Sequence, residues 1–124
     1  MFSPKILCVS FDRAVSENRC SNLKEAGYEV TARTSVKEGL ELLKGEKFDA
    51  VIIGHRFSAQ EKYLLAVEAK QSANTRVVLV RGSTQDSEIP ATIRVYALEG
   101  NTGLLSALSR LFSAKVAAWQ RAAA

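Results

Sequence analysis

Three basic side chains follow apolar runs of the sequence, at positions where they could meet. His55 and Arg56 come just after the run that ends at Ile53, and Arg81 follows a run of valines and leucine. Arginine presents a planar fork of donors that suits carboxylate and phosphate groups. The pattern favours an ion pair between Arg81 and Asp12, which would contribute about 0–1 kcal/mol if partly exposed. The alternative is an anion-binding pocket made by Arg81, His55 and Arg56.

The residue pattern gives little support for a metal site or a catalytic nucleophile. Cys8 and Cys20 form no CxxC pair and have a single histidine for company, so a zinc site is not expected. Asp12 alone makes a poor magnesium site, because such sites use more than one carboxylate or a substrate phosphate. The sequence contains no GxGxxG, GxxxxGK(S/T), GxSxG or HExxH motif. We therefore expect no enzyme activity, no metal and no cofactor.

The composition is typical of an ordinary globular protein. Of the 124 residues 47% are apolar and 24% are charged, and the formal net charge is +4. The basic residues are scattered and do not interleave with aromatics, so a nucleic-acid partner is not expected. No run approaches the roughly 18 apolar residues that a membrane span needs, and the N-terminal residues lack the features of a signal peptide. We expect a cytoplasmic protein with no membrane partner.

Short β-rich runs alternate with longer helical patterns along the chain. Three of the runs are almost continuously apolar, which is typical of parallel strands that are covered on both faces. The expected strands are Lys5–Val9, Tyr28–Ala32, Phe48–Ile53, Arg76–Val80 and Thr92–Tyr96.

The helical patterns carry recognisable start and stop signals. Capping boxes open two of them, at Ser35 and Ser58, and Gly27 can end the first because glycine adopts a positive φ without strain. The GNTG run at residues 100–103 is expected to form a turn with Asn101 or Thr102 as N-cap, the alternative being a phosphate cradle at a helix N-terminus. The expected helices are Arg13–Ala26, Ser35–Leu43, Ser58–Ala69 and Thr102–Ala118.

This order of elements predicts an α/β fold with a parallel sheet, right-handed crossovers and helices on both faces. Only ten residues, Gly82–Ala91, separate the fourth and fifth strands. They include Pro90, so we expect a loop there with at most one turn of helix. One domain is expected over residues 1–118, followed by a C-terminal tail over residues 119–124.

From Lys5 to about Lys115 the sequence resembles a response-regulator receiver domain. The similarity is carried by KILCV at Lys5–Val9, LKEAGYEV at Leu23–Val30, and EGLELL at Glu38–Leu43 followed by FDAVII at Phe48–Ile53. The resemblance implies a flavodoxin-like (CheY-like) three-layer α/β/α sandwich, with five parallel strands in the order 2-1-3-4-5 and a fourth helix that is short or missing. In such folds the working site lies at the carboxyl ends of the strands.

The resemblance also implies where a phosphorylation site would stand. Receivers place an acidic pair after the first strand, a phosphoacceptor aspartate after the third, Ser or Thr after the fourth, and lysine after the fifth. The carboxylates hold Mg²⁺, which shields the phosphoryl group during transfer. In this chain those positions fall on Ser10 and Phe11 (with Asp12 next), Gly54, Arg81 and Ala97. We therefore expect a degenerate receiver without a phosphoacceptor or a metal site.

The first helical pattern is unusually polar for a helix that covers a sheet. Asn18, Arg19 and Asn22 stand where Leu, Ile or Val would be more usual. Two explanations are open: a shift in which face of the helix is buried, or a polar face that binds a partner.

Three functions are open on the sequence alone. The first is a phosphorylation-independent interaction module of a two-component or phosphorelay system, which docks on a signalling protein or forms a homodimer, with Trp119 as a candidate contact. The second is a domain that senses a small anion or nucleotide in a pocket rebuilt around Arg81. The third is a conventional phosphoacceptor, which the missing aspartate disfavours.

Overall fold

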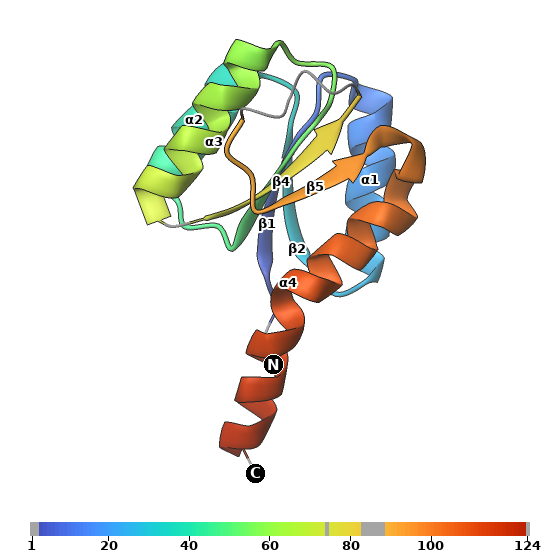
Figure 1. The fold of residues 1–124 in the computed structure, drawn as a ribbon, viewed down its shortest axis with the longest axis vertical. Coiled ribbons are helices and arrows are strands. Elements are labelled where there is room, and N and C mark those ends of the chain that lie inside the picture. The colour runs from blue at the N-terminus through green and yellow to red at the C-terminus, as the bar shows by residue number, and fades with distance from the viewer. Residues whose placement is uncertain (1–2, 74, 83–88, 124) are drawn as a thin grey trace.

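The computed structural model describes residues 3–73, 75–82 and 89–123, with residues 72, 73 and 113–123 described as backbone only. Within these residues five strands alternate with four α-helices and a short 3₁₀ turn, η2 (Figure 1). Every expected strand and helix is present, and the largest boundary shifts are at the ends of α3 and α4. The elements are β1 Lys5–Val9, α1 Arg13–Glu25, β2 Glu29–Arg33, α2 Val36–Gly45, β3 Ala50–Ile53, α3 Ala59–Ala73, β4 Arg76–Arg81, β5 Ile93–Tyr96, η2 Ala97–Glu99 and α4 Gly100–Ala123.

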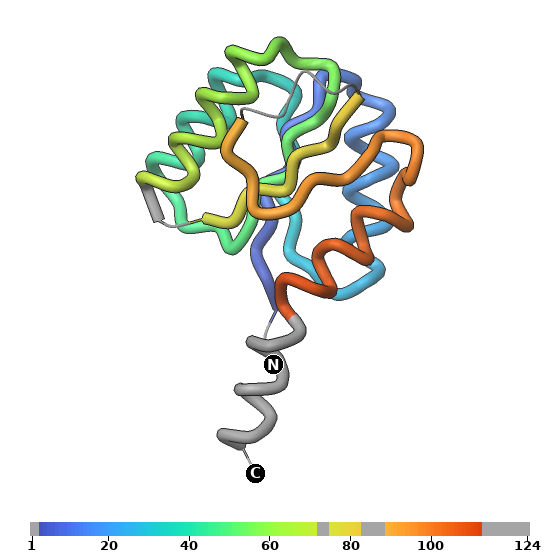
Figure 2. The backbone as a smooth tube through the Cα atoms, viewed as in Figure 1, coloured from blue at the N-terminus to red at the C-terminus, as the bar shows by residue number. Residues whose placement is uncertain are grey.

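The five strands form one parallel sheet in the order β2-β1-β3-β4-β5, which confirms the order that the resemblance implied. The register places Val9 beside Ile53, Ile53 beside Leu79, and Arg81 beside Tyr96. Because neighbouring strands are parallel and in register, the segments that follow β1, β3 and β5 leave from one edge of the sheet (Figure 2). The candidate residues of the sequence lie along this edge.

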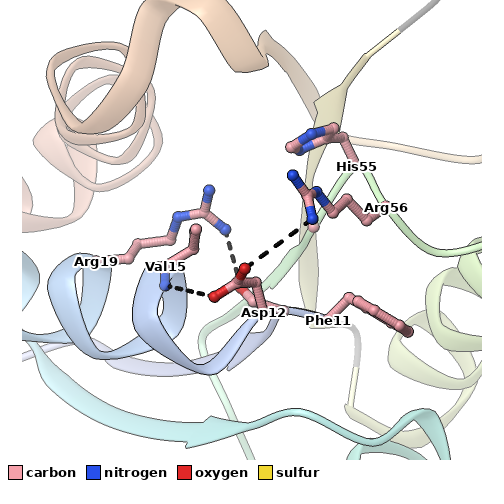
Figure 3. A pocket seen from close by; sticks show the side chains of 8 residues that line it. Phe11, Asp12, Val15, Arg19, His55 and Arg56 are labelled. Atoms are coloured by element: carbon pink, nitrogen blue, oxygen red, sulfur yellow. Dashed lines mark hydrogen bonds and ion pairs between the residues drawn. The ribbon is translucent and has the colours of Figure 1, made fainter.

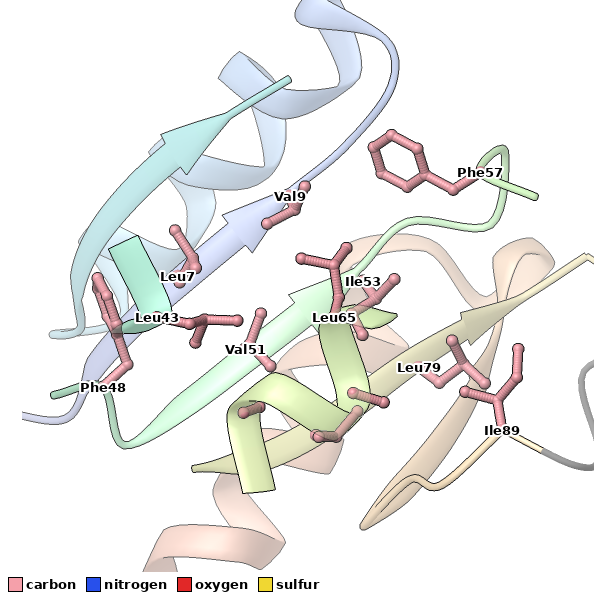
Figure 4. Packing of buried hydrophobic residues seen from close by; sticks show 13 residues of the cluster. Leu7, Val9, Leu43, Phe48, Val51, Ile53, Phe57, Leu65, Leu79 and Ile89 are labelled. Carbon is pink, nitrogen blue, oxygen red and sulfur yellow. The ribbon is translucent and has the colours of Figure 1, made fainter. Parts of the chain in front are cut away.

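Two hydrophobic cores cover the two faces of the sheet. Helices α2 and α3 lie on one side, and α1 and α4 on the other (Figure 1). Successive residues of a strand point into opposite cores: Leu7 and Val9 face the α2–α3 side, while Ile6 and Cys8 face the α1–α4 side. Figure 4 shows the first of these cores, in which Leu65 of α3 packs over the sheet. Each fully buried aliphatic side chain stabilises the fold by about 1.5–3 kcal/mol.

The helix starts follow the capping signals of the sequence. At α3 both bonds of the box are present, from Ser58 N to Glu61 Oε1 (3.0 Å) and from Glu61 N to Ser58 Oγ (3.2 Å). At α2 Ser35 Oγ accepts from Glu38 N, whereas the Glu38 carboxylate pairs with Arg33 of β2. Gly27 has a φ of 99°, so the expected end of α1 at a positive-φ glycine is confirmed.

The connection from β4 to β5 has no helix among its described residues, Gly82 and 89–92. The turn of helix allowed by the sequence would fall on residues 83–88, which lie outside the described part. Ile89 is buried in the core on the α2–α3 side (Figure 4). Arg94 donates to the Ile89 carbonyl, and Thr92 Oγ1 accepts from Val77 N at 3.0 Å. Side-chain and main-chain bonds therefore anchor the end of this connection to the sheet.

The start of α4 differs from the expected one. Residues 100–103 form its first turn, so the separate turn with Asn101 or Thr102 as N-cap was wrong. Gly100 has a φ of 59° and stands between η2 and the helix, so the change of direction occurs two residues earlier than expected. The helix continues to Ala123, beyond the expected end at Ala118. None of the helices within the described residues has both the length and the apolar character to cross a bilayer.

Candidate functional site

A small pocket lies at the edge of the sheet where β1 and β3 end. It has a volume of about 20 Å³, which is room for a single water molecule. Figure 3 shows Arg19 entering from α1 on one side, His55 and Arg56 on the other, and Asp12 between them. The lining residues are Ser10, Phe11, Asp12, Val15, Arg19, Gly54, His55 and Arg56. The structure thus brings together the expected positions after β1 and β3.

Gly54 forms a wall of this pocket by close backbone packing. Its N–H donates to Val9 O at 2.9 Å. A Cβ atom at residue 54 would stand 3.3 Å from both Ser10 Cα and Val9 O. Because both contacts are with backbone atoms, a side chain here needs the ends of β1 and β3 to move apart by a few tenths of an ångström. The main chain of β1 therefore packs closely against the position at which the phosphoacceptor was expected.

Arg19 brings a positive charge into the pocket from α1. The residue is only 8% exposed, and its Nη1 donates to Ser10 Oγ at 2.9 Å. Its Nε is buried and has no hydrogen-bond partner. Among the described residues no carboxylate lies within 4.0 Å of this guanidinium. Sequence reasoning noticed the polarity of Arg19 but did not place it in the site.

A signal for Arg19 was present in the helical spacing. Ser16, Arg19 and Leu23 are the buried residues of α1, and they follow each other at intervals of three and four residues. Arg19 therefore occupies the same stripe as Leu23, which faces the core. Neither of the two explanations offered for the polar helix describes this arrangement, because the buried stripe itself contains the polar Ser16 and the cation Arg19, and Arg19 reaches the pocket.

Asp12 organises the start of α1. Its Oδ1 accepts from Ala14 N (2.9 Å) and Val15 N (3.2 Å), so it serves as the helix N-cap. Its Oδ2 lies 4.0 Å from Arg56 Nη1, and both side chains are partly exposed. At this distance and exposure the ion pair contributes about 0–1 kcal/mol. The carboxylate is thus occupied by capping and by a loose pair with a cation.

The expected ion pair between Arg81 and Asp12 was wrong. Arg81 stands beside Tyr96 in the register of β4 and β5, and its guanidinium lies 5.5 Å from the centre of the Tyr96 ring. Its Nε is also buried without a partner. Adjacent residues of parallel strands project to the same face, so Arg81 packs on its strand neighbour rather than on the loop after β1. The expected cluster of Arg81, His55 and Arg56 therefore divides, with His55 and Arg56 in the pocket.

A larger groove adjoins the pocket between α1 and the start of α4. Its volume is about 440 Å³, and it shares Val15, Arg19 and His55 with the small pocket. Ala97, on which the resemblance to receivers placed the lysine, lies on this groove and offers no charge. Across it Asn101 Nδ2 donates to Asn18 Oδ1 at 2.7 Å, which ties α4 to α1.

The groups beside the pocket fit a metal poorly. Nowhere in the described residues do three His, Cys, Asp or Glu side chains gather as a metal ion would require. Cys8 is fully buried, as expected, and its Sγ lies 3.6 Å from Ser10 Oγ. Burial raises the pKa of the Cys8 thiol above its ordinary value. The thiol is therefore held in its neutral form.

No family model matches the sequence, and no curated protein matches it. Solved structures do match in three dimensions. The receiver domain of a sensor histidine kinase from Pseudomonas aeruginosa has a TM-score of 0.78 at 14% identity, covering 90% of this chain and 99% of its own. A CheY-like receiver domain protein from Methanospirillum hungatei has a TM-score of 0.78 at 21% identity, with coverages of 90% and 96%. The chemotaxis protein CheY4 of Vibrio cholerae has a TM-score of 0.73 at 18% identity, with coverages of 89% and 99%.

The chain has the receiver fold. Because each of these likenesses is below 25% identity, it concerns the fold and leaves the chemistry of the site to be argued from the residues. The Pseudomonas domain was crystallised with a magnesium ion coordinated in its active-site cleft. In the present chain the pocket at the ends of β1 and β3 is lined by Arg19, and Asp12 is the single acidic residue among those that line it.

Proposed function

We propose that this chain is a receiver-fold signalling module that acts through protein–protein contacts and is not switched by phosphorylation. The observation that carries the proposal is the buried guanidinium of Arg19, bonded to Ser10 inside the pocket. A fixed positive charge repels the divalent cation that would assist phosphoryl transfer. Gly54 also supplies no carboxylate that could form an acyl phosphate. Both features favour a pocket with one lasting arrangement.

The surface around β5 and η2 supports a role in contact with another protein. Leu98 is fully exposed on η2, and Tyr96 at the end of β5 is 54% exposed. The Arg81 guanidinium stacks against the Tyr96 ring. We call Arg81, Tyr96 and Leu98 the β5–η2 surface. Exposed apolar groups next to an arginine and an aromatic ring are typical of protein contact sites. Trp119, the contact suggested by the sequence, lies among residues whose side chains the structure does not describe.

Phosphorylation is tested with a small-molecule phosphodonor. We expect the intact mass of the wild-type protein to stay unchanged after incubation with acetyl phosphate and Mg²⁺. The Gly54→Asp variant should also remain unmodified, because Arg19 still opposes the metal. Addition of a phosphoryl group to the wild-type chain would refute the phosphorylation-independent part of the proposal and revive the conventional phosphoacceptor.

Contact through the β5–η2 surface is tested by a charge at its most exposed residue. Leu98→Glu should abolish self-association in sedimentation equilibrium, or capture of the partner protein from native cell extract. Leu64→Glu is the matched control, since Leu64 is an exposed leucine of α3 on another part of the surface. Equal binding by wild type and Leu98→Glu would show that this surface is not the contact.

The second function considered is recognition of a small anion around Arg81. The position of Arg81 does not support it. Arg81 packs against Tyr96 and lines neither the pocket nor the adjoining groove. The cation that does line both cavities is Arg19, on a different element of the fold.

A further inference from the structure

Arg19 carries a positive charge that the described residues do not balance. It is nine-tenths buried, its Nη1 donates to Ser10 Oγ, it also interacts with the Cys8 thiol, and its Nε has no partner. No carboxylate of the described chain pairs with it. Burying an ion is strongly unfavourable unless it is paired and hydrogen-bonded, so buried charges in proteins almost always have partners. The missing counter-charge of Arg19 is the feature to explain.

The groove beside Arg19 has the size and the lining of a ligand site. Its volume of about 440 Å³ lies within the roughly 300–1,000 Å³ of small-molecule sites. Asn18 and Asn101 line it from α1 and α4, and His55 lines it from the loop after β3. The residues that line the groove include no Asp or Glu. Amide, imidazole and guanidinium groups are all able to donate hydrogen bonds to an oxyanion.

The first turn of α4 adds to this electrostatic setting. Gly100 and Asn101 lie on the groove, and the helix that they open is 24 residues long. The first N–H groups of a helix have no partner within it, and they carry the positive end of the helix dipole. The dipole alone would not define a site. The dipole favours an anion in the groove, and the unpaired charge of Arg19 independently favours one as well.

We propose that the groove between α1 and α4 reversibly binds an oxyanion of the phosphate class, with Arg19 as its principal ligand. Nη1 is engaged by Ser10 and Nε is buried, so Nη2 is the guanidinium nitrogen left to donate to an oxygen of the ligand. The other donors come from α1, α4 and the β3–α3 loop, so they approach from several directions. A tetrahedral phosphate presents oxygens in several directions and can accept from all of them, whereas the two oxygens of a carboxylate lie in one plane. The bound group is not attached covalently.

The inference is independent of the protein-contact role proposed above. The phosphorylation experiment reads a covalent change of mass, whereas the binding experiment reads reversible occupation of the groove. Either can fail without affecting the other.

The test is a titration of the ¹⁵N-labelled full chain with inorganic phosphate at constant ionic strength, followed by amide chemical shifts. We expect saturable shifts at Asn18–Cys20 and Gly100–Gly103, with a Kd of about 0.1–10 mM. Arg19→Gln should weaken binding at least about tenfold, while Arg13→Gln should bind as the wild type does. Arg13 is the matched control because it is an exposed arginine of the same helix and pairs with Glu17.

Two further arms sharpen the result. Adenosine monophosphate tests whether a phosphate monoester enters the groove, and sulfate tests whether any tetrahedral oxyanion does. Asn101→Asp places a negative charge on the groove at a helix start that tolerates acids, so this variant should fold and lose phosphate binding even if Arg19→Gln does not fold. Shifts that do not saturate below about 50 mM, or shifts that are equal in wild type and Asn101→Asp, would overturn the proposal.

Discussion

Arg19 Nη1 of α1 and Ser10 Oγ at the end of β1 share a buried hydrogen bond of 2.9 Å. The guanidinium also interacts with the thiol of Cys8, and its Nε has no hydrogen-bond partner. The bond joins the first helix to the first strand at the edge of the sheet where the small pocket lies. The stability and the chemistry of the pocket therefore depend on the same pair of side chains.

Removal of the Ser10 hydroxyl should expose this dependence. We expect Ser10→Ala to lower the free energy of unfolding by about 1–3 kcal/mol, because it leaves the buried guanidinium without its acceptor. In an Arg19→Met background the same change should cost less than about 1 kcal/mol, since no cation remains to be satisfied. Urea denaturation of the four proteins of this cycle gives the coupling energy. Equal effects of Ser10→Ala in both backgrounds would mean that the hydrogen bond is energetically silent.

Two glycine-to-alanine changes should act in opposite directions. Gly54→Ala should lower the free energy of unfolding by about 1–3 kcal/mol, because its Cβ meets backbone atoms of β1 at 3.3 Å. Gly45→Ala, at the end of α2, should raise it by about 0.5–1 kcal/mol, because no atom lies within 4 Å of its Cβ and alanine favours the helix. Thermal unfolding of the pair measures the contrast. Equal stability of the two variants would contradict the close packing at Gly54.

The buried thiol of Cys8 should make the fold sensitive to alkali. Its pKa is raised above the ordinary value of 9.0 by burial, so the folded state keeps a proton that the unfolded state releases. Stability is thus unaffected below pH 9 and declines as the pH rises from 9 toward the folded pKa. The pKa of half-buried Tyr28 is raised for the same reason and adds to the decline at higher pH.

The measurement is urea unfolding between about pH 7 and pH 10.5. Cys8→Ala should be less stable than wild type at pH 7 but should lose less of its stability as the pH rises. Cys20→Ala, which removes a partly exposed thiol, is the control for the loss of a cysteine as such. A Cys8→Ala profile parallel to that of the wild type would show that the thiol does not titrate differently in the folded state.

The stacked pair of β4 and β5 should be structural and separate from the groove. We expect Tyr96→Leu to lower the free energy of unfolding by about 0.5–1 kcal/mol through loss of the cation–π contact with Arg81. Arg81→Gln should have a similar effect, and the double variant should add little to either. Phosphate affinity should be the same in Arg81→Gln and wild type. A loss of phosphate binding in Arg81→Gln would show that Arg81 contributes to the anion site.

Much of the fold could be predicted because local signals and the global pattern agree. The apolar run of β3 is buried on both faces, as its lack of alternation indicated, and Ser58 and Glu61 form the expected capping box. The start of α4 was missed because Asn and Thr are common N-caps, whereas here Gly100 with its positive φ makes the transition. Local preference was overridden there by the geometry of η2.

The pocket was harder to predict because side-chain direction depends on packing between elements. Strand periodicity correctly placed Gly54, His55 and Arg56 at one edge. It could not show that Arg81 would turn to the ring of Tyr96, which needs the β4–β5 register. Nor did it reveal Arg19, although the helical spacing to Leu23 contained the information. When a cation lies on the buried face of an amphipathic helix, its charged group should be considered as part of the site that the helix adjoins.

The close approach of Gly54 to Ser10 has a consequence for redesign of this protein. Where the shape of a cavity depends on side chains, a single replacement is enough to change its chemistry. Here the spacing of two polypeptide backbones sets the shape, so a new acid at residue 54 would need the main chain of Val9 and Ser10 to shift by a few tenths of an ångström. Engineering of phosphotransfer into this scaffold would thus have to begin with loop geometry and only then proceed to residue identity.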